Sequence, residues 1–231
     1  MTPAAVLLDA LGTLVALEPP WPLLRAELAA RGVEVTEAEA RTALLAEIAF
    51  YRAHHDEAVD AAALDALRDR CATVLDAALP PHARGVPDLR DALLASLRFA
   101  PYPEVPAALA ALRAAGRRLV VVSNWDVSLH QVLATTGLAP HLDGVVTSAE
   151  CGAAKPDPAI FRRALALAGD IAPQDAVHVG DSVEADVAGA VAAGLEPILV
   201  VRDGAPAPPG VTVLADLQGL PALLGPYSPK G

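Results

Sequence analysis

The sequence predicts an α/β fold: a doubly wound parallel sheet whose chain is interrupted by an inserted all-helical cap domain. Three observations support this fold class. Short apolar runs rich in β-branched residues end in small or acidic residues at five places. Helical patterns closed by glycine lie between the later runs. A long stretch near the N-terminus has helical periodicity without a convincing strand.

The strands and helices of the predicted sheet alternate along the chain. The helical patterns cover residues 127–137, 158–169 and 185–194, and the apolar runs cover residues 5–9, 119–124, 144–149, 176–181 and 197–202. Strand, helix, strand at this spacing indicates parallel pairing with right-handed crossovers. Ligands of such sheets bind beyond the carboxyl ends of the strands. We therefore expect four residues that directly follow their strands to share one edge: Asp9, Ser123, Asn124 and Asp181.

The predicted helical insertion covers residues 17–100. Its pattern is one amphipathic helix after another. Prolines near residue 101 mark the point where the chain returns to the sheet. The sequence thus predicts a core domain of residues 1–16 and 101–231 and a cap domain of residues 17–100. The last segment is expected to add one short edge strand.

Composition narrows the class of function. Hydrophobic residues make up 54% of the chain, yet no run reaches the roughly 18 apolar residues that a membrane span needs. The net charge is −11, and no basic stripe suited to nucleic acid is present. The two isolated cysteines, Cys71 and Cys151, fit a reducing compartment. We expect a cytoplasmic protein that acts on a small molecule, with no nucleic-acid or membrane partner.

Four motifs stand in order at the predicted strand ends: "DALGT" from Asp9, "SN" from Ser123, "KPDP" from Lys155 and "GDSVEAD" from Gly180. In this order and spacing they resemble the haloacid dehalogenase superfamily of hydrolases, in the subfamily (I) whose helical cap follows the first motif. The resemblance covers nearly the whole chain and implies a hydrolase. Lysine is rare here, with two against fifteen arginines, which favours a specific need for the compact ammonium of Lys155.

The resemblance implies a role for each matching residue. A carboxylate at a strand end can attack phosphorus or carbon to form a covalent ester, and Asp9 is the predicted nucleophile. Ser123 would hydrogen-bond the transferred group, and Lys155 would neutralise the charge of the nucleophile and the phosphoryl oxygens. Thr13 and Asn124 are predicted to contact the substrate.

The same motifs predict a magnesium site. Asp9, Asp181 and Asp186 supply carboxylate oxygens, the ligands that Mg²⁺ prefers. In the family a further oxygen is the backbone carbonyl two residues after the nucleophile, which here belongs to Leu11. Because this ligand is a main-chain atom, it does not depend on the side chain at position 11.

Leu11 nevertheless departs from the pattern of the family's phosphatases, which carry a second aspartate there to protonate the leaving group. General acid–base help of this kind is worth roughly 10²- to 10⁴-fold. Three functions stay open. A Mg²⁺-dependent phosphatase acting through an aspartyl-phosphate is favoured, with its acid elsewhere or a leaving group that needs none. A metal-independent 2-haloacid dehalogenase releases a halide without a proton. A weakly active or non-catalytic binding protein would only retain the scaffold.

Overall fold

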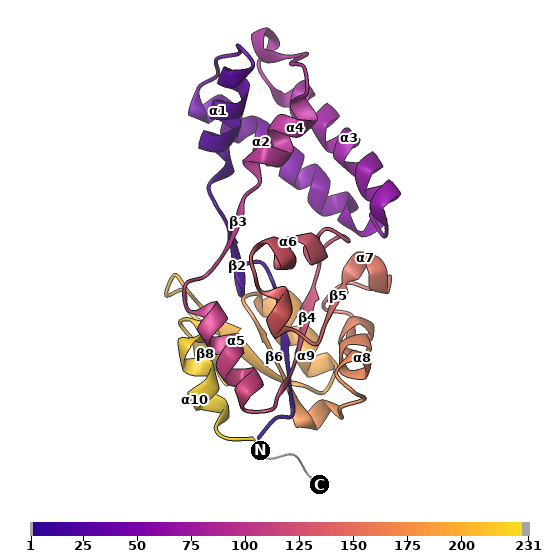
Figure 1. The fold of residues 1–231 in the computed structure, drawn as a ribbon, viewed down its shortest axis with the longest axis vertical. Helices are drawn as coiled ribbons and strands as arrows, with labels where there is room; N and C mark the ends of the chain where they lie inside the picture. The colour runs from indigo at the N-terminus through magenta and orange to yellow at the C-terminus, as the bar shows by residue number, and fades with distance from the viewer. Residues whose placement is uncertain (1, 228–231) are drawn as a thin grey trace. The chain divides into compact units, whose positions relative to one another are not determined.

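The computed structural model describes residues 2–227, and within them the chain forms two compact units (Figure 1). The core unit contains the residues up to Ala16 and those from Pro101 onward. The helical unit runs from Leu17 to Ala100. No helix in the described part of the chain is both long and apolar enough to cross a membrane.

The core unit is built on a parallel sheet, as the sequence predicts. Its strand order is β5-β4-β1-β6-β7-β8, and every neighbouring pair in it runs parallel. The first strand therefore lies inside the sheet, between strands that come much later in the sequence. The strands are β1 Ala5–Leu8, β4 Arg118–Ser123, β5 Gly144–Thr147, β6 Ala176–Gly180, β7 Glu196–Val200 and β8 Thr212–Leu214.

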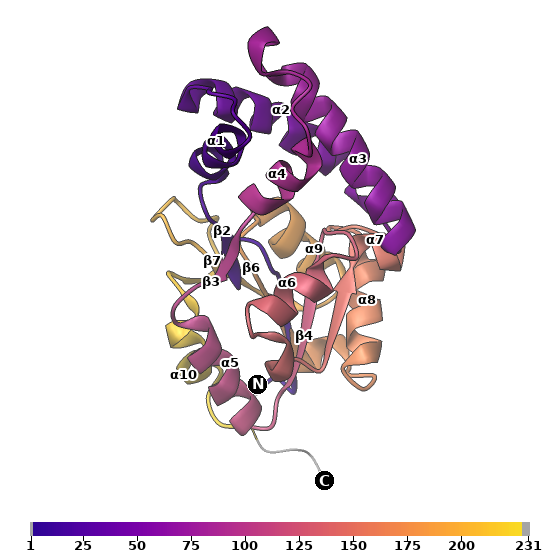
Figure 2. The same ribbon diagram turned by 45° about the horizontal axis from the view of Figure 1, so that its top comes forward.

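Helices cover both faces of this sheet, which confirms the doubly wound fold class. α8 and α9 pack on one face, where Phe161 and Ile160 meet Leu7, Val120 and other buried residues. Figures 1 and 2 both show α5 and α10 together on the other side of the core unit. The core helices are α5 Val105–Ala114, α6 Leu129–Thr135, α7 Ser148–Cys151, α8 Pro158–Leu167, α9 Ala188–Ala192 and α10 Leu220–Leu224.

Glycine ends three of these helices where the sequence predicts it. Gly137, Gly169 and Gly194 follow the last residues of α6, α8 and α9 with φ of 74°, 105° and 77°. Glycine adopts this left-handed conformation without the steric cost of a Cβ atom. The helix expected over residues 185–194 begins differently, as a π-helical turn at Val183–Val187 that leads into α9.

Two short strands and one short helix differ from the sequence expectation. β2 (Val15–Leu17) and β3 (Phe99–Pro101) pair with each other and are too short to show an alternating pattern. The third apolar run stops being a strand at Thr147, because its hydroxyl accepts a hydrogen bond from the Glu150 N–H and begins α7. The predicted edge strand near the C-terminus is β8.

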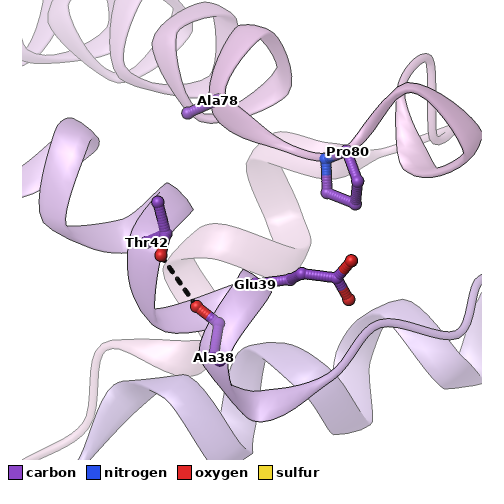
Figure 3. Close-up of a pocket in the computed structure, with 5 residues that line it drawn as sticks. All are labelled: Ala38, Glu39, Thr42, Ala78 and Pro80. Atoms are coloured by element: carbon purple, nitrogen blue, oxygen red, sulfur yellow. Dashed lines mark hydrogen bonds between the residues drawn. The ribbon is translucent and has the colours of Figure 1, made fainter.

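The helical unit contains four α-helices, which are α1 Pro20–Ala30, α2 Glu37–His54, α3 Ala61–Ala78 and α4 Leu89–Ser96. Thr36 and Glu39 form a capping box at the start of α2, and Asp60 caps α3. Leucines fill the interior between the helices, but Glu47 of α2 is also buried there. A pocket of about 260 Å³ lies beside the start of α2. Figure 3 shows its lining residues, among which the Thr42 hydroxyl donates to the Ala38 carbonyl.

Candidate active site

Three carboxylates meet at the carboxyl end of the central strands. Leu8 of β1 lies opposite Val179 of β6, so the residues after these strands are neighbours. Asp9 follows β1, and Asp181 follows β6. One oxygen from each of Asp9, Asp181 and Asp186 lies within 4.8 Å of the others. The strand register thus brings together residues separated by more than 170 positions in the sequence.

Lys155 and Ser123 complete the surroundings of Asp9. Ser123 ends β4, the other neighbour of β1, and its hydroxyl donates to Oδ1 of Asp9 at 3.0 Å. The Lys155 ammonium donates to the same oxygen at 2.6 Å and to Oδ1 of Asp186 at 2.5 Å. Lys155 is 5% exposed, and Asp9 is 6% exposed. A buried ammonium therefore bridges the predicted nucleophile and the last carboxylate of the fourth motif.

The chain around Lys155 is held from two directions. The Asn124 side-chain amide accepts from the Lys155 N–H at 2.7 Å and donates to the Lys155 carbonyl at 2.9 Å. On the other side, Asp157 caps α8 by accepting from the Ala159 N–H, and Pro158 occupies the first helical position. The "KPDP" motif thus fixes the backbone from which the ammonium reaches into the core. The contact of Asn124 with the substrate stays a prediction.

The "GDSVEAD" segment folds back on itself after β6. The Ser182 hydroxyl accepts from the Ala185 N–H, while the Ser182 N–H donates to Oδ2 of Asp186 at 2.9 Å. Gly180 leaves room for this carboxylate, because a Cβ atom there would lie 2.1 Å from Cγ of Asp186. These contacts turn Asp186 inward, where it is 2% exposed.

Gly12 makes the corresponding space for Asp181. Its φ is +87°, and an added Cβ atom would lie only 2.0 Å from Oδ2 of Asp181. The neighbouring residue Leu11 is 40% exposed, so its side chain does not belong to the buried core. Thr13 is fully buried, and its hydroxyl has no hydrogen-bond partner among residues 2–227. Its contact with a substrate stays a prediction.

The electrostatics of the cluster reflect crowded negative charge. Partial burial, together with the charges of Asp9 and Asp186, raises the pKa of Asp181 to about 6. Burial also raises the pKa of Asp9, against the opposing effect of Lys155. Burial alone would lower the pKa of Lys155, but Asp9 and Asp186 hold it above its ordinary value. One ammonium faces three carboxylates, which leaves the site with an excess of negative charge.

The residues fit a hard divalent cation. Mg²⁺ prefers oxygen ligands and takes one or two carboxylates while it keeps several waters. Asp181 is exposed, unlike Asp9 and Asp186, and its carboxylate stands beside theirs. A cation there would offset the repulsion that raises the pKa of Asp181. The donor set and its charge therefore suit the predicted metal.

His178 is a site residue that the sequence analysis did not single out. It lies on β6, is 1% exposed, and its Nε2 lies 2.8 Å from Oδ1 of Asp186. Burial alone would raise the pKa of Asp186, but Lys155 and, after it, His178 hold this pKa well below its usual range. The other ring nitrogen, Nδ1, has no hydrogen-bond partner among residues 2–227. A histidine in the apolar strand "AVHVG" was the available signal.

Arg202 is a second such residue, just beyond β7. Its guanidinium donates to the carbonyl of Gly12 at 3.0 Å and to the carbonyl of Thr13 at 2.8 Å. It also pairs with Glu104 and lies over the Tyr102 ring, 3.4 Å from the centroid. Arg202 thus holds the loop after Asp9 against the segment by which the chain returns from the helical unit. Nothing in the local sequence around "VVRDG" marks this contact.

Comparison with known proteins agrees with the architecture. The family model of haloacid dehalogenase-like hydrolases matches residues 3–194. The chain is 45% identical over 94 residues to haloacid dehalogenase-like hydrolase domain-containing protein 3 of Bos taurus, covering 41% of this chain and 37% of that protein. It is 43% identical over 132 residues to a phosphoglycolate phosphatase of Cupriavidus necator, covering 54% and 56%. The chain thus spans only about a third to a half of these curated relatives.

The similarity to a solved structure extends over the whole length. The crystal structure of a HAD phosphatase from Thermococcus onnurineus has a TM-score of 0.67 with this chain and 27% identity. The match covers 96% of this chain and 98% of the other. The likeness therefore includes both the core unit and the helical unit, each as a fold.

Proposed function

The chain belongs to the haloacid dehalogenase-like hydrolases and is a hydrolase, and from this premise we propose that it is a Mg²⁺-dependent phosphatase of small molecules. One observation carries the proposal: Asp9 shares a buried ammonium with Asp186 and lies beside the carboxylate of Asp181. A nucleophile, a fixed positive charge and an oxygen-rich cation site in one place suit the transfer of a phosphoryl group. A relative that is named as a phosphatase supports the same reading.

In the proposed reaction Asp9 attacks phosphorus. A bond forms between a carboxylate oxygen and phosphorus, while the bond from phosphorus to the leaving-group oxygen breaks and its electron pair stays on that oxygen. Water then attacks phosphorus of the aspartyl-phosphate, so that phosphate leaves and the carboxylate is regenerated. Lys155 and Ser123, which both contact Oδ1 of Asp9, hold the carboxylate in position and stabilise the charge on the phosphoryl oxygens.

Asp9, Asp181, Asp186 and the backbone carbonyl of Leu11 are the proposed ligands of Mg²⁺. When bound, the ion would neutralise charge on the phosphoryl oxygens and orient the substrate. The carboxylates differ in their freedom to take part. Asp186 already accepts hydrogen bonds at both oxygens, whereas Asp181 is exposed at the edge of the cluster. We therefore propose Asp181 as the ligand on which cation affinity depends most.

Leu11 restricts which leaving groups the proposed reaction can use. An exposed leucine supplies no proton to a leaving alcohol. The first step would then be fast only for leaving groups that are stable as anions, or for alcohols protonated from another source. The same feature favours the second candidate, a 2-haloacid dehalogenase, because a halide leaves without a proton. Three neighbouring carboxylates count against it, since without a metal ion only the Lys155 ammonium offsets their repulsion.

The test is an assay of the purified protein on phosphate esters and on 2-haloacids, each with Mg²⁺ and with a chelator. The proposal expects phosphate release that the chelator abolishes and that Asp9→Asn lacks. Asp91→Asn is the matched control, because Asp91 is an exposed residue of α4 in the helical unit. Halide release that survives the chelator supports the second candidate and contradicts the first. No turnover on either panel contradicts both.

A further inference from the structure

We propose that His178 is a positioning residue of this site, which acts on the reaction through Asp186 and Lys155. The inference rests on the proposed function and adds a residue that the four motifs do not include. Its starting point is a polar ring in an apolar place. All five residues of β6 are buried, and the strand lies between β1 and β7 inside the sheet.

Among residues 2–227, one of the two ring nitrogens of His178 has a hydrogen-bond partner. The ring packs in a T-shaped arrangement with Phe161 of α8, with the ring centroids 4.9 Å apart and the planes at 84°. Nε2 lies 2.8 Å from Oδ1 of Asp186, which is the hydrogen bond of an N–H donor to a carboxylate. Nδ1 is buried without a partner among residues 2–227. An unpartnered buried nitrogen costs stability, so packing alone would favour an apolar side chain here.

Asp186 is the point through which His178 reaches the nucleophile. Its Oδ1 accepts from both His178 and Lys155, and its Oδ2 accepts from the Ser182 N–H. Three donors in different directions fix the plane of the carboxylate. The Lys155 ammonium is in turn shared between Asp186 and Asp9, at 2.5 Å and 2.6 Å. A chain of three hydrogen bonds therefore runs from His178 to Asp9.

The two donors to Oδ1 of Asp186 determine how the Lys155 ammonium is shared between Asp186 and Asp9. Without the His178 N–H, Oδ1 of Asp186 is held by Lys155 alone, and the carboxylate can rotate toward the ammonium. Asp186 would then bind the Lys155 ammonium more strongly, and Asp9 would bind it less strongly. We infer that the ring keeps Lys155 equally engaged with both carboxylates, which is the position needed to stabilise charge at Asp9. Hydrogen-bond partners behind metal-site carboxylates typically change activity or metal affinity by about 10- to 100-fold.

The experiment compares two substitutions on the purified full chain. His178→Leu fills the core but removes the donor, whereas His178→Gln keeps an amide N–H at about the reach of Nε2. The inference expects kcat of the leucine variant to fall about 10- to 100-fold with KM little changed, and the glutamine variant to recover most of that loss. Mg²⁺ affinity, measured by calorimetry without substrate, should weaken in the same order. His82→Leu, an exposed histidine of the helical unit, is the control and should match the wild type.

Several outcomes would overturn the inference. One is a folded leucine variant with wild-type kcat and Mg²⁺ affinity, and another is a glutamine variant that loses as much as leucine while both stay folded. Should neither variant fold, ¹⁵N NMR of the His178 ring in the wild type and in Asp186→Ala decides. A shift of the Nε2 signal supports the contact, and an unchanged signal refutes it. A wild type inert on every substrate contradicts the proposed function instead, so the two failures are distinguishable.

Discussion

Gly12→Ala should weaken Mg²⁺ binding and activity by more than its effect on folding stability explains. A Cβ atom at position 12 would lie 2.0 Å from Oδ2 of Asp181. An ordinary carbon–oxygen contact is about 3.4 Å, so the carboxylate must move by roughly 1.4 Å, and a misplacement of about 1 Å can cost about 100-fold in rate. Alanine at a φ of +87° also costs about 1–2 kcal/mol of folding stability. We expect both kcat and Mg²⁺ affinity to fall sharply.

Gly137→Ala is the matched control for this substitution. Gly137 has a φ of +74°, and an added Cβ atom would meet nothing within 4 Å. Both variants should lose the stability that a positive φ costs alanine, and Gly137→Ala measures this loss without the clash. Only Gly12→Ala should weaken Mg²⁺ binding, measured by calorimetry, by about 10-fold or more. Equal Mg²⁺ affinity in the two variants would refute the argument that Gly12 makes room for a metal-binding Asp181.

Three further predictions concern other ionisable side chains. Lys155→Arg should lower kcat about 100-fold. The planar guanidinium does not fit the space of an ammonium that lies 2.6 Å from Asp9. A variant with wild-type kcat would show that any cation at this position suffices. Burial raises the pKa of Glu47, so its folded form prefers the proton, and the resulting stability is present at low pH and lost as pH rises through the raised pKa. Glu47→Gln should therefore raise Tm more at about pH 8 than at about pH 5, by about 2–4 °C for each 1 kcal/mol, and the same change at both values would contradict this. Arg202→Lys should lower Tm and weaken Mg²⁺ binding about 10-fold, because a lysine cannot hold the carbonyls of Gly12 and Thr13 together. If calorimetry finds an unchanged Mg²⁺ affinity, Arg202 has only a structural role.

The fold class was predictable because its signals are local. Apolar runs, helical periodicity and glycine caps each occupy a few neighbouring residues, and strand alternation with helices restricts the sheet to a parallel arrangement. The strand predicted over residues 144–149 stops at Thr147, because this residue caps α7 by accepting a hydrogen bond from the Glu150 N–H. β2 and β3 are formed by pairing between distant segments, so three residues of sequence carry no pattern of their own.

In the candidate site, too, the residues marked by a local pattern were predictable and the others were not. Asp9, Ser123 and Asp181 were predictable from one rule, since each lies at or just after the end of a strand of a parallel sheet. Lys155 required the motif as well, because it lies on the loop before α8. His178 and Arg202 were missed because each acts through a hydrogen bond that the local sequence does not indicate. His178 contacts Asp186 around a turn, and Arg202 contacts the carbonyl of Gly12 far along the chain. The catalytic roles assigned to Asp9, Ser123 and Lys155, the substrate contacts of Thr13 and Asn124, the metal ligands and the cytoplasmic location all stay predictions.

The most direct test of the account follows the oxygen of water through one turnover. The full chain, at a concentration above that of its substrate, reacts in water labelled with oxygen-18, and mass spectrometry then examines both the released product and the peptide that contains Asp9. Water that attacks phosphorus of an aspartyl-phosphate leaves the label in phosphate and the mass of the peptide unchanged, which is the predicted result. Label in the Asp9 carboxylate would mean that water attacked the carbon of an ester, as in a dehalogenase, and would contradict the phosphatase.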